Sequence, residues 1–245
     1  MIAISLVLDA TAATTQPVNL GAATSFAVLG GSAITVIGEV DSTTIYGDVG
    51  SFPTPAMTGF ENVKLYGVNH GGDTVTQAAK LDLVTAYDDA VSRTPTTIYA
   101  AATDLGTRTL APGVYNSPTS IFLSGVLTLE GTADDVWIFQ AGSTVISAAN
   151  SVVTMMGGAK ASNVFWQVGS SVTLESGTQF AGTLLVLTAI TLNTGVVVDG
   201  RLLARNAAVS LDHSNITSWA AVPEPSNLLC GVLLAAGALR RRVAR

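Results

Sequence analysis

The chain has 245 residues, of which 48% are apolar and only 11% charged, against about 25% charged in an ordinary domain. This composition excludes a disordered chain. Among the residues that are neither apolar nor charged, 30 are Thr and 24 are Gly. The net charge is −6, and four of the eleven Lys and Arg residues lie in the last six positions, which leaves no basic patch for nucleic acid. With one Cys and two His residues, we also expect no metal and no cofactor.

The N-terminus carries a short apolar run, residues 2–8, followed by Ala10-Thr11-Ala12, a small-residue pattern typical of a signal-peptide cleavage site. The run lacks a basic segment before it, and Asp9 follows it directly. We interpret residues 1–16 as a signal-peptide remnant, which predicts secretion. An N-terminal strand is the alternative interpretation. The folded domain is expected over residues 17–221.

Most of this domain is predicted to be strand. Short runs of Val, Ile, Leu and Thr are separated by Gly or Asn, as is typical of β-rich folds. The clearest expected strands are residues 25–29, 33–37, 43–46, 126–129, 136–139, 164–168, 172–174, 184–187 and 196–198.

One segment, residues 74–92, has helical periodicity instead. Its apolar residues recur every four positions, at Val75, Ala79, Leu83, Tyr87 and Val91, with Ala78 and Val84 beside them. Thr74 and Gln77 are expected to form a capping box, and Pro95 to end the segment. The polar side chains of the helix are expected to face solvent: Lys80, Asp82, Asp88 and Asp89.

The C-terminal half contains an internal repeat. Segments 170–176, 188–194 and 207–213 share an apolar-hydroxyl-Leu pattern at spacings of 18 and 19 residues, and segments 125–131 and 143–149 are similar. A repeat of about 20 residues built from short strands and turns indicates a β-solenoid, in which stacked coils bury one continuous core.

Strand alternation predicts which side chains face that core. The expected inward residues are Val172, Leu174, Ile190, Leu192, Val209 and Leu211, and upstream Leu127, Leu129, Ile146 and Ala148. The expected outward residues are Thr173, Glu175, Thr191, Asn193, Ser210 and Asp212, and upstream Thr128, Glu130, Ser147 and Ala149.

The uncharged outward residues form a short, hydroxyl-rich column that repeats once per coil. A rigid grid of hydroxyl and methyl groups can order water in a repeating pattern, as an ice-binding face requires. We therefore hypothesise an ice-binding face, with Thr191 as its most informative residue. Its members are Thr128, Ser147, Ala149, Thr173, Thr191, Asn193 and Ser210. The alternative is that Thr simply suits exposed strand positions.

The C-terminus, residues 222–245, has the order of a sorting signal. Val222-Pro223-Glu224-Pro225 precedes an apolar stretch over 228–239, which is short for a membrane span, and then Arg240-Arg241-Arg242. This order resembles the PEP-CTERM sorting tail. The resemblance implies export to the surface of a Gram-negative bacterium, transient membrane anchoring and removal of the tail.

Seven motifs follow one another along the domain, at residues 18–35, 45–50, 109–115, 127–131, 136–144, 163–174 and 200–211. In this order they resemble the secreted ice-binding (antifreeze) protein family of bacteria and fungi. The resemblance implies a mainly β fold: a right-handed parallel β-solenoid (β-helix) of triangular section, with one long α-helix alongside and N- and C-terminal strands interleaved. It also implies adsorption to ice and no enzymatic activity. We expect a monomer.

Two departures from the family pattern bear on the ice-binding hypothesis. Residues 147–150 are the nearest match to the family's T-A/G-x-T/N motif, and Glu175 and Asp212 place carboxylates in the outward column. The connection over residues 59–73 is also short for the insertion that the family often has before its helix.

Two other functions compete with ice binding. A polysaccharide-cleaving enzyme would need paired carboxylates, for which Asp134-Asp135 and Asp48 are the candidates. Turn positions explain these residues more simply. The other alternative is a cell-surface or extracellular-matrix adhesion protein.

Overall fold

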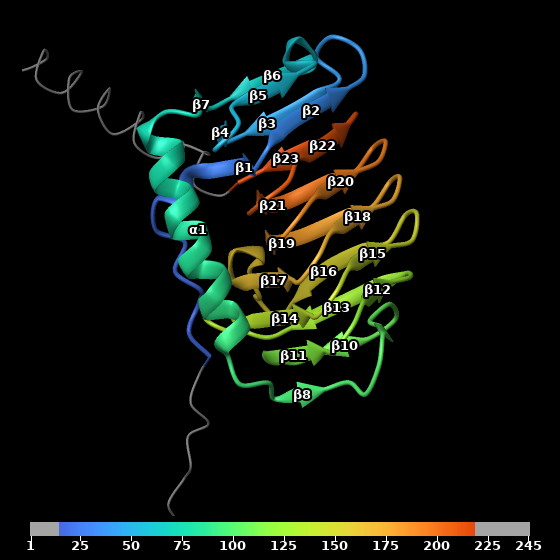
Figure 1. Cartoon of the computed structure of the whole chain (residues 1–245). Coiled ribbons are helices and arrows are strands. Elements are labelled where there is room, and N and C mark those ends of the chain that lie inside the picture. Colours follow the sequence, from blue (N-terminus) through green and yellow to red (C-terminus); the bar gives the residue numbers. More distant parts are fainter. Residues whose placement is uncertain (1–14, 219–245) are drawn as a thin grey trace, which may run out of the picture.

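Short strands alternate with turns throughout residues 15–218, the part of the chain that the computed structural model describes. All strand pairs are parallel, and the strands stack as coils around a common axis. A full coil contributes one strand to each of three faces, and a single long helix lies along one of these faces (Figure 1).

The helix face is the one that α1 (Thr74–Ser92) covers. Its strands, in stacking order, are β8 (Thr97–Ile98), β11 (Gly113–Ser117), β14 (Trp137–Ala141), β17 (Val164–Val168), the second halves of β19 (Gln179–Val186) and β21 (Val197–Ala204), β1 (Phe26–Gly30), β4 (Asp48–Ser51) and β7 (Asn69–Gly71).

The second face, which we call the hydroxyl face, is a separate eight-stranded sheet. Its strands, in stacking order, are β9 (Thr103–Asp104), β12 (Ile121–Leu123), β15 (Val145–Ser147), β18 (Val172–Leu174), β20 (Ile190–Leu192), β22 (Val209–Asp212), β2 (Ala33–Ile37) and β5 (Ala56–Thr58).

The third face, which we call the mixed face, joins the helix face because β19 and β21 run through both. Its strands are β10 (Thr109–Leu110), β13 (Val126–Glu130), β16 (Val152–Met156), the first halves of β19 and β21, β23 (Asn215–Thr217), β3 (Thr43–Tyr46) and β6 (Val63–Tyr66). Gly182 and Gly200 pair at this corner, where a Cβ on Gly200 would lie 1.8 Å from the Gly182 carbonyl oxygen. Three 3₁₀ turns complete the described elements: η1 (Gly21–Ser25), η2 (Phe60–Asn62) and η3 (Ala161–Asn163).

The coils do not stack in chain order. Strands β1, β2 and β3 of the N-terminal coil pair with β21, β22 and β23 of the last C-terminal coil. Figure 1 shows this as blue N-terminal strands above the red and orange C-terminal ones. The expected β-solenoid with interleaved ends and one helix alongside is therefore confirmed.

Interior side chains form columns that run from coil to coil. Leu174, Leu192 and Leu211 pair in register, as expected, and Val36 of β2 extends their column. All four are at most 4% exposed. A second interior column consists of the stacked rings of Tyr115, Phe139 and Trp166, with Phe180 tilted against the last. Stacked apolar columns of this kind supply both stability and rigidity to the sheets outside them.

Helix α1 has the expected bounds but a different cap, and its buried stripe agrees with the expected one only in part. Asp73 is the N-cap, since its carboxylate accepts the Thr76 N–H at 2.9 Å, whereas Thr74 is the first helical residue. Val75 and Val91 are 41% and 49% exposed. Ala79, Leu83 and Tyr87 of the expected stripe are buried, and Thr76, Lys80, Ala86 and Ala90 complete the buried side of the helix.

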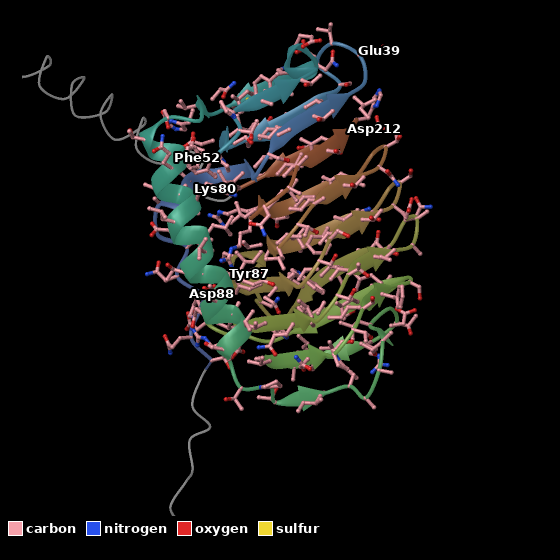
Figure 2. All side chains as sticks on the ribbon, viewed as in Figure 1. Glu39, Phe52, Lys80, Tyr87, Asp88 and Asp212 are labelled. Carbon is pink, nitrogen blue, oxygen red and sulfur yellow. The ribbon has the colours of Figure 1, made fainter. Side chains whose placement is uncertain are left out.

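Lys80 was expected in solvent and instead lies against the strands, next to Tyr87 on the same side of α1 (Figure 2). Its Nζ donates to the carbonyl oxygens of Ala204 and Arg205 at 2.7 and 2.6 Å. Burial, and secondarily the charge of Arg205, lowers the pKa of Lys80 to about 8. The long aliphatic stem lets a lysine reach these carbonyls from the apolar side of the helix, which periodicity alone does not reveal.

Of the expected strands, residues 33–37, 43–46, 164–168 and 172–174 are strands with those bounds, and residues 25–29, 126–129 and 136–139 are strands shifted by one or two residues at an end. The segments expected at 184–187 and 196–198 belong to longer strands, Gln179–Val186 and Val197–Ala204. No helix among residues 15–218 is long and apolar enough to cross a membrane. Almost all of the predicted leader and the whole predicted tail fall outside this range, so both stay predictions.

Candidate functional site

The hydroxyl face presents a central outward column that is uniform over five neighbouring strands. Its members are in register from β18 to β5: Thr173, Thr191, Ser210, Thr35 and Thr58. Strands in a sheet lie about 4.8 Å apart, so these hydroxyls repeat at that interval along the solenoid axis. Because the residues on either side of Thr173, Thr191, Ser210 and Thr35 point into the core, these hydroxyls cannot tilt independently of the sheet.

A second outward column lies two residues before the first on each strand, about 6.6 Å away along the strand direction. It consists of small, uncharged residues: Ser171, Ala189, Ala208, Ala33 and Ala56. Hydroxyl and methyl groups therefore alternate over this part of the face, without a long side chain among them.

At the other end of the hydroxyl face the central column changes character. Ile146 pairs with Thr173, and Phe122 pairs with Ile146 on the next strand. Phe122 is 39% exposed and projects further than a threonine. The flat region is thus confined to the five strands from β18 to β5.

One border of the hydroxyl face carries charge. Glu175, Asn193 and Asp212 follow or end β18, β20 and β22. Figure 2 shows Asp212 on the side of the face away from the helix. Glu175 Oε2 accepts from Asn193 Nδ2 at 2.7 Å, and Asp212 Oδ2 accepts from Thr194 Oγ1 at 2.5 Å. The bond from Thr194, together with His213 Nδ1 2.5 Å from Asp212 Oδ1, lowers the pKa of the Asp212 carboxyl.

Four of the seven proposed ice-binding residues lie together. Thr173, Thr191 and Ser210 share the central column of the hydroxyl face, and Asn193 stands at its charged border. The outward directions expected for Glu175 and Asp212 also agree with their partial exposure.

The other three residues lie elsewhere. Thr128 points outward, but from β13 on the mixed face, because the hydroxyl-face strand of its coil is β12. Ser147 is 1% exposed and points inward, where its Oγ bonds Thr178 Oγ1 at 2.7 Å and accepts the Glu175 N–H. Ala149 lies in the turn after β15. The expected directions of Ile146 and Ser147 were therefore wrong: the pairing of Val145 with Val172 turns Ile146 outward.

Sequence reasoning also missed Thr35 and Thr58, which extend the central column by two strands. A signal for Thr35 was present: residues 33–35 and 189–191 are both Ala-Ile-Thr. The two segments lie far apart in the chain, and only the interleaving of N- and C-terminal coils brings them onto one face.

The mixed face lacks a uniform column. Its central positions, in register, are Thr109, Thr128, Thr154, the buried Ala181, Asp199, Thr217, Tyr46 and Tyr66. The rings of Tyr46 and Tyr66 stack at 4.5 Å between centroids, and the Lys64 ammonium lies 5.6 Å from the Tyr66 ring. Threonine therefore forms a continuous run only at one end of this face, on β10, β13 and β16, and recurs singly at Thr217.

Two of the carboxylates considered for catalysis, Asp135 and Asp48, have structural partners. Asp135 Oδ2 accepts from the Thr132 N–H and hydroxyl at 2.7 and 2.9 Å, as expected of a turn, beside a groove of about 520 Å³. Asp48 Oδ1 accepts the Val68 N–H at 2.9 Å. Within residues 15–218, no three His, Cys, Asp or Glu side chains are grouped so that they could hold a metal ion.

Comparison with known proteins agrees with the fold and the repeat. The family described as ice-binding-like matches residues 28–217. The chain belongs to the ice-binding-like family. An ice-binding protein of Nostoc sp. (strain HG1) is 41% identical over 221 residues, covering 86% of this chain and 80% of the relative. One from Flavobacterium frigoris (strain PS1) is 33% identical over 217 residues, covering 82% and 76%.

Solved structures of the ice-binding-like family superpose on this chain. An ice-binding protein from an Antarctic ascomycete, Antarctomyces psychrotrophicus, has a TM-score of 0.78 at 36% identity and covers 83% of this chain and 98% of its own. One from an Antarctic biological consortium has a TM-score of 0.76 at 36% identity, covering 84% and 93%.

Proposed function

We propose that this protein adsorbs to ice through the hydroxyl face and thereby inhibits ice growth or recrystallisation. The observation that carries the proposal is the unbroken column of five hydroxyls, flanked by a column of small residues, on a flat sheet. The contact residues proposed are Thr173, Thr191, Ser210, Thr35 and Thr58, with Asn193 at the border. The names of the relatives and structural neighbours support ice as the ligand.

Rigidity is the physical reason that this surface suits a crystalline ligand. Many weak contacts must form at the same time on the ice lattice. Each contact contributes less to the free energy of adsorption if the protein group that makes it can move. The buried column Leu174–Leu192–Leu211 fixes the hydroxyls above it, so little conformational entropy remains to be lost on adsorption. Short side chains add to this effect, because they have few rotamers.

The proposed activity requires no cofactor, metal or nucleic-acid partner, and a single chain carries the whole hydroxyl face. We propose accordingly that the protein is a monomer without enzymatic activity. The hydrogen-bonded turn around Asp135 supports the absence of enzymatic activity, and the acidic net charge of −6 supports the absence of a nucleic-acid partner.

The site of action proposed is outside the cell, where ice forms. The apolar start of the chain supports secretion, and the order of Pro223-Glu224-Pro225, apolar stretch and arginine cluster supports sorting to the outer surface of a Gram-negative bacterium. In this proposal the tail anchors the chain transiently in the membrane.

Partitioning into ice tests the proposal against the adhesion alternative. The full chain, fluorescently labelled, is included in a slowly growing ice hemisphere, and its solution is assayed for thermal hysteresis. We expect incorporation into the ice and a measurable freezing gap. Exclusion of the chain from ice, together with adsorption to bacterial polysaccharide, would favour adhesion, and release of soluble sugar would revive the enzyme.

A further inference from the structure

The carboxylates of the hydroxyl face present a difficulty for ice binding, because a free carboxylate keeps its own hydration shell. Within residues 15–218, the strands of this face and the residues that directly follow them carry three: Asp104, Glu175 and Asp212. All three are hydrogen-bonded by an uncharged side chain, and in each case the donor comes from the neighbouring coil.

The three pairs have a common geometry. Asn193 Nδ2 donates to Glu175 and Thr194 Oγ1 donates to Asp212, each across 18 residues of sequence. The Ser124 hydroxyl donates to Asp104 across 20 residues. Because the partner sits one coil away, each bond runs along the solenoid axis, parallel to the sheet. A carboxylate held in this direction lies on the surface of the sheet and does not project from it.

Further contacts hold two of these carboxylates in place. The backbone N–H groups of Gly106 and Ser124 donate to Asp104 Oδ1 at 2.8 and 3.1 Å. His213 Nδ1 lies 2.5 Å from Asp212 Oδ1. Within residues 15–218, Asn193 is the one hydrogen-bond donor to the Glu175 carboxylate, so this pair is the one most easily released by one substitution.

We propose that Asn193 and Thr194 are positioning residues, which hold the carboxylates of Glu175 and Asp212 flat so that the charged border does not obstruct ice at the hydroxyl face. This inference rests on the proposed function and deepens it. Asn193 then acts on ice through Glu175, and its role differs from that of the contact residues Thr173 and Thr191.

A double-variant series in the full chain tests the inference at the Asn193–Glu175 pair. Asn193→Ala releases a flexible carboxylate, so we expect a loss of roughly half or more of the thermal hysteresis, which the double variant Asn193→Ala/Glu175→Ala restores. Glu175→Ala alone leaves thermal hysteresis at or above that of the parent. Asn215→Ala is the matched control, since Asn215 is exposed on the mixed face. Melting temperature monitors folding.

The possible results separate this inference from the proposed function. Equal losses in Asn193→Ala and in the double variant would show that Asn193 contacts ice directly, and would overturn the inference. Full activity of Asn193→Ala alongside loss in Thr191→Tyr would also overturn it while leaving the hydroxyl face intact. A parent without ice activity would overturn the proposed function itself. Restoration by the second substitution is the result expected here, and a purely structural role for Asn193 does not give it.

Discussion

The hydroxyl face and the mixed face are stacks of the same coils, yet their outward residues differ. Five neighbouring strands of the hydroxyl face carry Thr, Thr, Ser, Thr and Thr in register. The matching column of the mixed face passes from threonines through Asp199 to a tyrosine pair. Both faces rest on buried apolar columns, for example Leu192 beneath the first and Leu129 beneath the second.

The difference answers the objection that threonine merely suits exposed strands. If strand propensity alone selected these residues, both open faces would show it to the same degree. The mixed face instead tolerates charged, aromatic and aliphatic residues at equivalent positions, including Lys64, Tyr66 and Val197. The far end of the hydroxyl face, with Phe122 and Ile146, varies in the same way. Folding therefore leaves the outward positions free to vary, and the regularity of the five strands from β18 to β5 points to a function.

The largest stability effect should be the same on both faces. Leu192→Ala and Leu129→Ala each remove a fully buried side chain, and each should lower the free energy of unfolding by about 2–5 kcal/mol in chemical denaturation. Equal losses would show that the two faces share one kind of interior. A cost below roughly 0.5 kcal/mol for either, as is usual for surface positions, would mean that the inward assignment of that face is inverted.

The helix face, which α1 covers, should make the free energy of unfolding depend on pH in a way that the hydroxyl face and the mixed face do not. Lys80 has a folded pKa of about 8, below its ordinary 10.5, so between these values the unfolded chain holds a proton that the folded chain has released. Stability should therefore rise by about 1–3 kcal/mol as the pH increases through this window. Denaturation of Lys80→Met across the same pH range should lack this rise. Parallel curves for parent and variant would contradict the assignment.

The smallest effect is expected for the C-terminal tail. Residues 15–218 contain both sheets and the helix, so deletion of residues 223–245 should change the melting temperature by no more than a few degrees and raise solubility. Calorimetry of the deleted and full chains makes the comparison. A large loss of stability would show that the tail packs on the solenoid, and both open faces would then need to be re-examined.

The sequence was sufficient for the solenoid, the helix bounds and the inward column Leu174–Leu192–Leu211, because these depend on periodicity and on spacing within the chain. It failed at Thr128 and Ser147 for a reason that periodicity cannot overcome. Every strand alternates in the same way, so the pattern predicts whether a side chain points inward or outward but not on which face it lies. A polar residue that points inward and is hydrogen-bonded there, as Ser147 is, makes even the inward or outward prediction wrong. Lys80 was misplaced similarly, since its carbonyl partners come from residues 204 and 205.

Thermal hysteresis of Thr191→Tyr and Thr128→Tyr, measured at equal concentration with the parent, tests the central claim most directly. Each substitution places the same ring at an outward, partly exposed strand position, one on the hydroxyl face and one on the mixed face, where an aromatic residue is compatible with the fold. The account predicts that Thr191→Tyr abolishes most of the activity, that Thr128→Tyr retains it, and that both keep the melting temperature of the parent. Loss of activity in Thr128→Tyr with retention in Thr191→Tyr would assign ice binding to the mixed face and contradict the account.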